Sequence, residues 1–105
     1  MTELNLTLPT PEFAATIVSV LEEMRRALNN HPQWPTCNVK RAAIVLEEAG
    51  EAIREANQLD EGKGSLQALK IELTQTAAMC FRMLNAISDD EQELASMSSQ
   101  FVGEE

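Results

Sequence analysis

The spacing of the apolar residues is the feature that most constrains this fold. Apolar side chains recur every three or four residues through long stretches of the chain, and no stretch shows the strict alternation of an amphipathic strand. The pattern is interrupted by the prolines at 32 and 35 and by the turn sequence DEGKG at 60–64. At 105 residues there is no room for a second core. We therefore predict a single all-α domain over 1–105.

Helix start and stop signals divide the pattern into four predicted helices. They cover 11–29, 38 to about 59, about 66–87 and about 89–100, with starts at Thr10-Pro11, Asn38, Ser65 and a Ser88–Glu91 capping box. One apolar stripe in each of the second and third helices is expected to face a neighbouring helix. The stripes are Ala42, Leu46, Ala49, Ile53 and Ala56, and then Leu66, Leu69, Leu73, Ala77, Cys80, Leu84 and Ile87.

The composition indicates that this domain is completed by self-association. Aromatic residues make up 4% of the chain and tyrosine is absent, so the core has little bulk per residue. A short chain also has a high ratio of surface to volume. Ile44, Val45 and Ala52 add apolar side chains beyond the main stripe of the second helix. We expect the four predicted helices to form a bundle that is completed by self-association.

The net charge of −9 argues against two classes of partner. Nucleic-acid polymers and anionic membranes are bound by clustered Lys and Arg, and the eight basic residues here are scattered. The N-terminal sequence lacks the features of a signal peptide, and no apolar run reaches membrane-spanning length. Cys37 and Cys80 are expected to be free thiols. We predict a cytoplasmic protein.

Carboxylates form a second pattern on the two central helices. Glu48, Glu51 and Glu55 share one face of their helix, and Glu72 with Gln75 forms an i, i+3 pair on the next. Oxygen ligands of this kind suit Mg²⁺ or Mn²⁺, although a row of glutamates is more often a solvated face. A ferritin-like di-iron site needs Glu-x-x-His pairs, and the single histidine lies in the proline-bounded loop.

The sequence EEAGE at 47–51, followed twenty residues later by ELTQ at 72–75, resembles the E-E-x-x-E and E-x-x-D signature of the MazG-like NTP pyrophosphohydrolases. The similarity covers about 34–84. It implies an all-α bundle that uses Mg²⁺ to convert NTP and water to NMP and diphosphate and that works as a homodimer or homotetramer. It also implies that Glu48, Glu51 and Glu72 bind metal and that Glu47 and Glu48 are candidate catalytic residues. Gln75 stands where the family has aspartate, so one metal-ligand charge is missing.

Four further residues are candidates for substrate binding, each with a structural alternative. Trp34 stacks on a base or packs against the end of the bundle. Lys40, Arg41 and Arg82 contact phosphate or serve as surface charges and ion-pair partners.

These features support one enzymatic hypothesis and two non-enzymatic ones. The first is a Mg²⁺-dependent nucleoside-triphosphate diphosphatase that removes non-standard nucleotides or deoxyribonucleotides. The second is a helical module of the same fold, weakened by Gln75, that binds a nucleotide or a protein without turnover. The third is a structural helical dimer with a solvated glutamate row.

Overall fold

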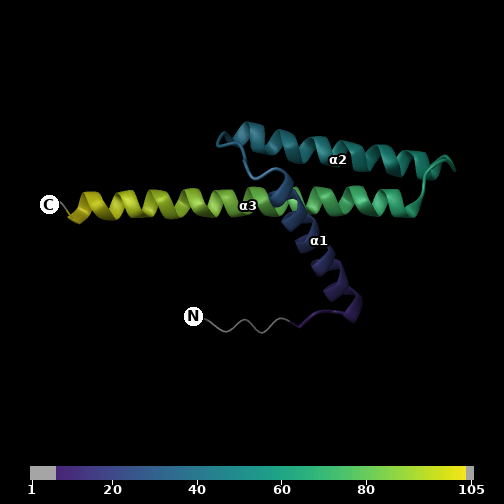
Figure 1. Cartoon of the computed structure of the whole chain (residues 1–105), viewed down its shortest axis with the longest axis horizontal. Coiled ribbons are helices and arrows are strands. Elements are labelled where there is room, and N and C mark those ends of the chain that lie inside the picture. The colour runs from purple at the N-terminus through teal and green to yellow at the C-terminus, as the bar shows by residue number, and fades with distance from the viewer. Residues whose placement is uncertain (1–6, 104–105) are drawn as a thin grey trace.

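The computed structural model describes the backbone of residues 7–103 and the side chains of residues 7–98. It contains three helices, α1 (Pro11–Asn30), α2 (Asn38–Asp60) and α3 (Leu66–Gly103), and no strand within the described part of the chain (Figure 1). The predicted all-α class is confirmed. The helix breaks at the prolines and at the glycine-containing turn are confirmed as well.

The prediction of a separate fourth helix was wrong, because α3 continues without interruption for 38 residues. Ser88 and Glu91 match a capping box, but a capping box is needed only where the preceding turn is broken. No proline or glycine lies between Leu66 and Val102 to break it. The polar residues at 88–93 therefore form an ordinary solvated part of a long helix.

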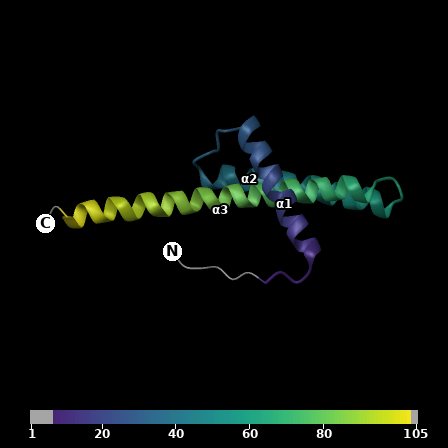
Figure 2. The same ribbon diagram turned by 60° about the horizontal axis from the view of Figure 1, so that its bottom comes forward.

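The helices are arranged around α3. α2 runs antiparallel beside it, and α1 crosses it steeply (Figures 1 and 2). The C-terminal part of α3 projects beyond both partners in the two views. The buried core is small and consists of Val20 and Ala27 from α1 with Ala78 and Met79 from α3. Met24, Trp34, Ile44, Val45 and Ala77 pack around it.

The tight turn between α2 and α3 sets these two helices side by side. Gly62 adopts φ of 79°, a left-handed conformation that favours glycine. A Cβ on Gly64 would lie 3.0 Å from the backbone nitrogen of Leu59, so this position also requires a small residue. Ser65 caps α3 as predicted, because its Oγ accepts the Ala68 N–H at 3.0 Å. At the other end of α2 the N-cap position is Cys37, and Asn38 is already helical.

The apolar stripe predicted to face a neighbouring helix from α2 is largely exposed in the single chain. Leu46 is 72% exposed and Ile53 63% exposed. The residues expected to be surplus pack instead, with Ala52 buried and Ile44 and Val45 half-buried. On α3 the stripe residues Leu66, Leu73 and Leu84 are exposed, while Ala78, Met79 and Arg82 are buried. For an isolated chain the prediction was wrong for the large leucine and isoleucine side chains named here, whereas Leu69, Ala77 and Cys80 of the α3 stripe are half-buried and Ala77 packs against the core.

The single chain is more extended than a compact monomer of its length. Its accessible surface is 8449 Å², whereas a compact folded monomer of 11.6 kDa exposes about 5,800 Å². Its radius of gyration is 18.1 Å, against about 13 Å for a compact domain of this length. A groove of about 630 Å³ on its surface is lined by apolar side chains only: Val39, Ala42, Ala43, Val45, Leu46, Ala49 and Met83.

Two smaller expectations are also addressed by the fold. Cys37 and Cys80 are free, as predicted. Within the described residues, every helix falls short of the combined length and apolarity that crossing a membrane requires.

Candidate metal centre and adjoining cavity

Three of the predicted carboxylates meet between α2 and α3. Glu48 and Glu51 come from adjacent turns of α2, and Glu72 comes from the facing side of α3. One carboxylate oxygen of each lies within 4.8 Å of the corresponding oxygens of the other two. All three residues are half-buried. The antiparallel packing of α2 on α3 is therefore what assembles this acidic triad from residues more than twenty positions apart.

The triad is electrostatically unsatisfied. One oxygen of Glu48 (Oε2) and one of Glu72 (Oε2) are buried without a hydrogen-bond partner in the described structure. Burial, followed by the charges of Glu51 and Glu72, raises the pKa of Glu48 above its ordinary value. Burial, followed by a hydrogen bond and charge repulsion from Glu51, raises the pKa of Glu72. Two carboxylates 4.8 Å apart repel by about 3 kcal/mol at an effective dielectric near 20, and solvent screening reduces this.

The donor set of the triad fits a small hard cation. Mg²⁺ binds oxygen at about 2.1 Å, so ligand atoms of one ion lie up to about 4.2 Å apart. The upper limit of 4.8 Å on the observed separations exceeds this by about 0.6 Å, and neighbouring ligands of an octahedral ion lie closer together, about 3 Å apart. The orphaned oxygens of Glu48 and Glu72 are free to serve as ligands. The arrangement can therefore hold a divalent ion with small side-chain movements.

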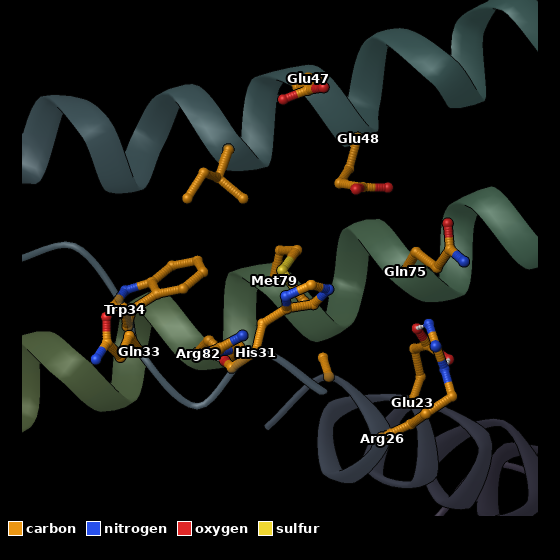
Figure 3. A pocket seen from close by; sticks show the side chains of 12 residues that line it. Glu23, Arg26, His31, Gln33, Trp34, Glu47, Glu48, Gln75, Met79 and Arg82 are labelled. Carbon is orange, nitrogen blue, oxygen red and sulfur yellow. Dashed lines mark hydrogen bonds and ion pairs between the residues drawn. The ribbon is translucent and has the colours of Figure 1, made fainter. Parts of the chain in front are cut away.

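A cavity of about 580 Å³ adjoins the triad at Glu48 (Figure 3). Towards one end lie Gln33, Trp34, His31 and Arg82, and towards the other lie Glu48 and Gln75. Glu47, Glu23 and Arg26 complete the polar lining, and Ala27, Ile44 and Met79 supply the apolar part. Glu23 and Arg26 form an ion pair with each other.

The remaining predicted site residues divide between this cavity and other locations. Glu47, Gln75, Trp34 and Arg82 line the cavity. Gln75 is one helical turn beyond Glu72 but is not part of the triad. Lys40 is exposed on the first turn of α2 and lies outside the cavity lining.

Arg41 is buried away from the cavity, where it fixes the loop that joins α1 to α2. Its Nε donates to the Pro35 carbonyl at 2.7 Å, and its Nη1 donates to Asn38 Oδ1 at 3.0 Å. The same Nη1 pairs with Asp90 of α3 at 2.8 Å. The structure thus uses Arg41 to tie the loop to α3.

Arg82 holds the same loop from a different side. Its Nη2 donates to the His31 carbonyl at 2.8 Å, and its guanidinium carbon lies 4.4 Å from the centre of the Trp34 ring. Sequence reasoning missed the contributions of Gln33 and of the Glu23–Arg26 pair to the cavity. The periodicity of α1 gave no sign of this pair, because a surface i, i+3 pair has the same pattern.

The raised pKa values of Glu48 and Glu72 predict an unusual pH dependence of stability without metal. Each folded carboxyl binds its proton more tightly than the unfolded one, whose ordinary pKa is 4.5. Its contribution to stability is therefore complete below about pH 4.5 and is lost as the pH rises through the raised pKa. Saturating Mg²⁺ should restore this stability at neutral pH, because metal ligands bind deprotonated.

Thermal melts from pH 4 to pH 8, in EDTA and in Mg²⁺, test this expectation. In EDTA, the melting temperature of the wild type should fall more as the pH rises above 4.5 than that of Glu48→Gln. Identical pH profiles for the two proteins would contradict the assignment.

A search for relatives identified none: no family model, curated protein or solved structure matches this chain.

Proposed function

We propose that this protein is a Mg²⁺-dependent nucleoside-triphosphate pyrophosphohydrolase that produces NMP and diphosphate. The observation that carries the proposal is the convergence of Glu48, Glu51 and Glu72 from two helices beside a cavity of about 580 Å³. These are the three intact metal-ligand positions of the MazG-like motif. The cavity has room for a nucleotide, and an aromatic ring and basic side chains line it.

The chain's own residues have separable roles in this proposal. Glu48, Glu51 and Glu72 would hold Mg²⁺ through their carboxylate oxygens, and Mn²⁺ is an alternative ion. When bound, the ion supplies charge neutralisation for the polyphosphate and lowers the pKa of a water molecule. Glu47 is exposed, lines the cavity and precedes Glu48 in the chain, so it is placed to accept a proton from water at the edge of the triad. Holding a cation also explains how a chain of net charge −9 would bind a polyanion.

Gln75 supports a second candidate function. It faces the cavity with an amide where the motif has a carboxylate, so the site has one ligand charge fewer. A site with weaker metal binding would still bind a nucleotide, or a protein that carries phosphate, without turning it over. Absence of turnover with retained nucleotide binding would distinguish this module from the enzyme. A purely structural helical dimer would bind neither metal nor nucleotide.

The enzymatic proposal is tested by product analysis over a panel of nucleotides. Standard, deoxy and modified NTPs are incubated with the full chain in Mg²⁺ or Mn²⁺, and products are separated by chromatography. We expect equal amounts of NMP and diphosphate from at least one nucleotide. Production of NDP and phosphate, or no turnover of any nucleotide, would refute the proposed reaction.

Gln75→Asp is expected to strengthen metal binding. The substitution adds a charged oxygen one helical turn from Glu72 on the side of α3 that lines the cavity. The attraction of this carboxylate to the metal exceeds the added repulsion between carboxylates only when metal is bound. The melting temperature of the variant should therefore rise more steeply with Mg²⁺ than that of the wild type. In EDTA the variant should be no more stable than the wild type.

Melts across a magnesium titration, with ionic strength matched by potassium chloride, measure this difference. Gln67→Asp makes the same chemical change at an exposed position of α3 and serves as the control. If Gln75→Asp and Gln67→Asp respond to Mg²⁺ in the same way, Gln75 does not adjoin a metal.

We also propose that the active form is a homodimer or homotetramer. The excess of accessible surface over a compact monomer is roughly 2,600 Å² per chain, or about 5,200 Å² for a pair, which lies at the upper end of the total area that obligate assemblies bury. The bare apolar face of α2, defined by Val39, Ala42, Leu46 and Ala49, is the surface that a second copy would cover. Two such hairpins of α2 and α3 packed face to face would form a four-helix bundle.

A further inference from the structure

The two buried arginines of this chain differ in how their charge is compensated. Arg41 is 4% exposed and Arg82 is 6% exposed. Arg41 makes three hydrogen bonds, one of them to the carboxylate of Asp90. Arg82 makes one, to the carbonyl of His31, and pairs with no carboxylate among the described side chains. The side chain is therefore largely buried without a counter-ion, and its unpaired nitrogens keep some exposure, since none is among the fully buried atoms that lack a partner.

An uncompensated buried guanidinium is unfavourable unless something supplies the opposite charge. Burial lowers the pKa of Arg82, which reflects this cost. A buried charge that lacks a partner is strongly destabilising, whereas the same charge with a well-placed partner is tolerated. The ring of Trp34, 4.4 Å from the guanidinium carbon, contributes a cation–π contact but no negative charge.

The position of Arg82 identifies where a partner would come from. Arg82 lines the cavity, unlike Arg41. Its Nε and Nη1 donate to no acceptor in the described part of the chain, so the guanidinium retains donors for a ligand in this cavity. His31 and Gln33 lie at the same end, and both have side chains able to donate hydrogen bonds (Figure 3).

The acids of the cavity do not replace this missing partner. Glu23 is paired with Arg26, and Glu47 forms no ion pair with Arg82. Glu48 lies towards the opposite end with Gln75 (Figure 3). Gln75 and Arg82 are seven residues apart on α3, which corresponds to about 10 Å along the helix axis. The cavity thus has an acidic end at Glu48 and a cationic end at Arg82.

We infer that the Arg82 end of the cavity is a binding site for a phosphate oxyanion, separate from the acidic triad. Guanidinium donors match phosphate oxygens in geometry and in charge. The phosphate could be free or part of a nucleotide, and the Arg82 contact is the same for both. This inference does not require the triad to hold metal or the protein to hydrolyse NTP.

The single tryptophan provides a direct probe of this site. The full chain is titrated with inorganic phosphate in EDTA at pH 7 and at fixed chain concentration, with potassium chloride matching the ionic strength. Trp34 emission should change saturably, because the charge held over its ring acquires a partner. At ten times the dissociation constant the melting temperature should rise by roughly 5 to 10 °C.

Variants of the two arginines make the test specific. Arg82→Gln should lose at least tenfold in phosphate affinity, and its melting temperature should not depend on phosphate. Arg82→Lys, which keeps a charge, should bind phosphate with reduced affinity. Arg41→Gln removes an equally buried guanidinium that holds the same loop from outside the cavity, and it should still bind phosphate.

Parallel titrations with a nucleoside and its monophosphate distinguish the source of the oxyanion. Tighter binding of the monophosphate than of inorganic phosphate, with loss in Arg82→Gln, assigns the site to a nucleotide phosphate. Equal binding assigns it to free phosphate. The titrations are repeated in Mg²⁺ with Glu72→Gln to separate this site from the proposed metal site. Glu72→Gln should lose only the increase in affinity that Mg²⁺ causes in the wild type, and its affinity for phosphate in EDTA should be unchanged.

Two outcomes would overturn the inference. One is that potassium chloride alone reproduces the change in Trp34 emission and melting temperature of the wild type. This comparison uses only the wild type, so it remains decisive if Arg82→Gln fails to fold. The other is a phosphate response of the same affinity in Arg82→Gln and the wild type, which would leave Arg82 with a purely structural role on the loop.

Discussion

Replacing any one of Glu48, Glu51 and Glu72 by glutamine is expected to reduce NTP hydrolysis by roughly 100-fold or more. The three carboxylates form one set of ligand oxygens within 4.8 Å of one another, so each substitution removes a charge and replaces a carboxylate ligand by a weaker, neutral amide oxygen. The measurement is the rate of diphosphate release at saturating Mg²⁺. Loss of activity should not reflect loss of folding, because neutralising one carboxylate also removes repulsion from the metal-free triad.

Stability in EDTA provides the internal check on this expectation. Each of the three variants should melt at or above the wild-type temperature without metal and should respond less to added Mg²⁺. Glu61→Gln removes a carboxylate from the exposed turn and should change neither activity nor the response to metal. Wild-type activity in all three triad variants would disprove the metal-site assignment.

Glu47→Gln separates metal binding from proton transfer. Glu47 lines the cavity but is not among the three carboxylates that meet between the helices. If it accepts a proton from water, its removal lowers the turnover rate and leaves stabilisation by Mg²⁺ intact. If Glu47 is a metal ligand, the turnover rate and the stabilisation by Mg²⁺ should fall together.

The acidic triad was expected because the EEAGE and ELTQ segments resemble a known metal-binding motif, and local geometry explains how its parts meet. The i, i+3 spacing of Glu48 and Glu51 places them on one face, and a short turn at 61–65 brings the next helix back alongside. What periodicity could not predict is which face of α2 meets α3. α2 has an apolar face and an acidic face, and the usual burial rule selects the apolar one. In the structure the side of α2 that packs on α3 carries Ala52 together with Glu48 and Glu51, and it leaves Leu46 exposed.

The contacts that shape the cavity lie beyond local reasoning for a different reason. Arg41 pairs with Asp90 across 49 positions, and Arg82 binds the His31 carbonyl across 51. The Arg41–Asp90 pair also depends on α3 continuing past Ser88, where the sequence predicted a break, whereas Arg82 lies within the helix predicted over about 66–87. A single sequence contains no signal that pairs residues at such separations. The helices could therefore be located from the sequence, but the loop that carries Trp34 could not be placed.

Leu46→Glu is expected to dissociate the proposed assembly. Leu46 is 72% exposed in the single chain and lies in a groove whose lining is apolar. In an isolated monomer the substitution would be nearly neutral, because substitutions at exposed positions usually change stability by less than about 0.5 kcal/mol. In a symmetric dimer it would bury two carboxylates in an apolar interface, which is far more unfavourable. A monomer therefore predicts little effect of Leu46→Glu, whereas a symmetric dimer predicts dissociation.

Light scattering at micromolar concentration measures the effect. The wild type should have the mass of a dimer or tetramer, and Leu46→Glu that of a monomer with a lower melting temperature. Val18→Glu places the same charge at a half-exposed apolar position of α1, outside the groove, and should leave the mass unchanged. If the interface has twofold symmetry with Leu46 near the axis, mixing Leu46→Glu with Leu46→Lys should restore association through opposite charges. A wild type that is monomeric throughout would show that the apolar face of α2 is not a contact between copies.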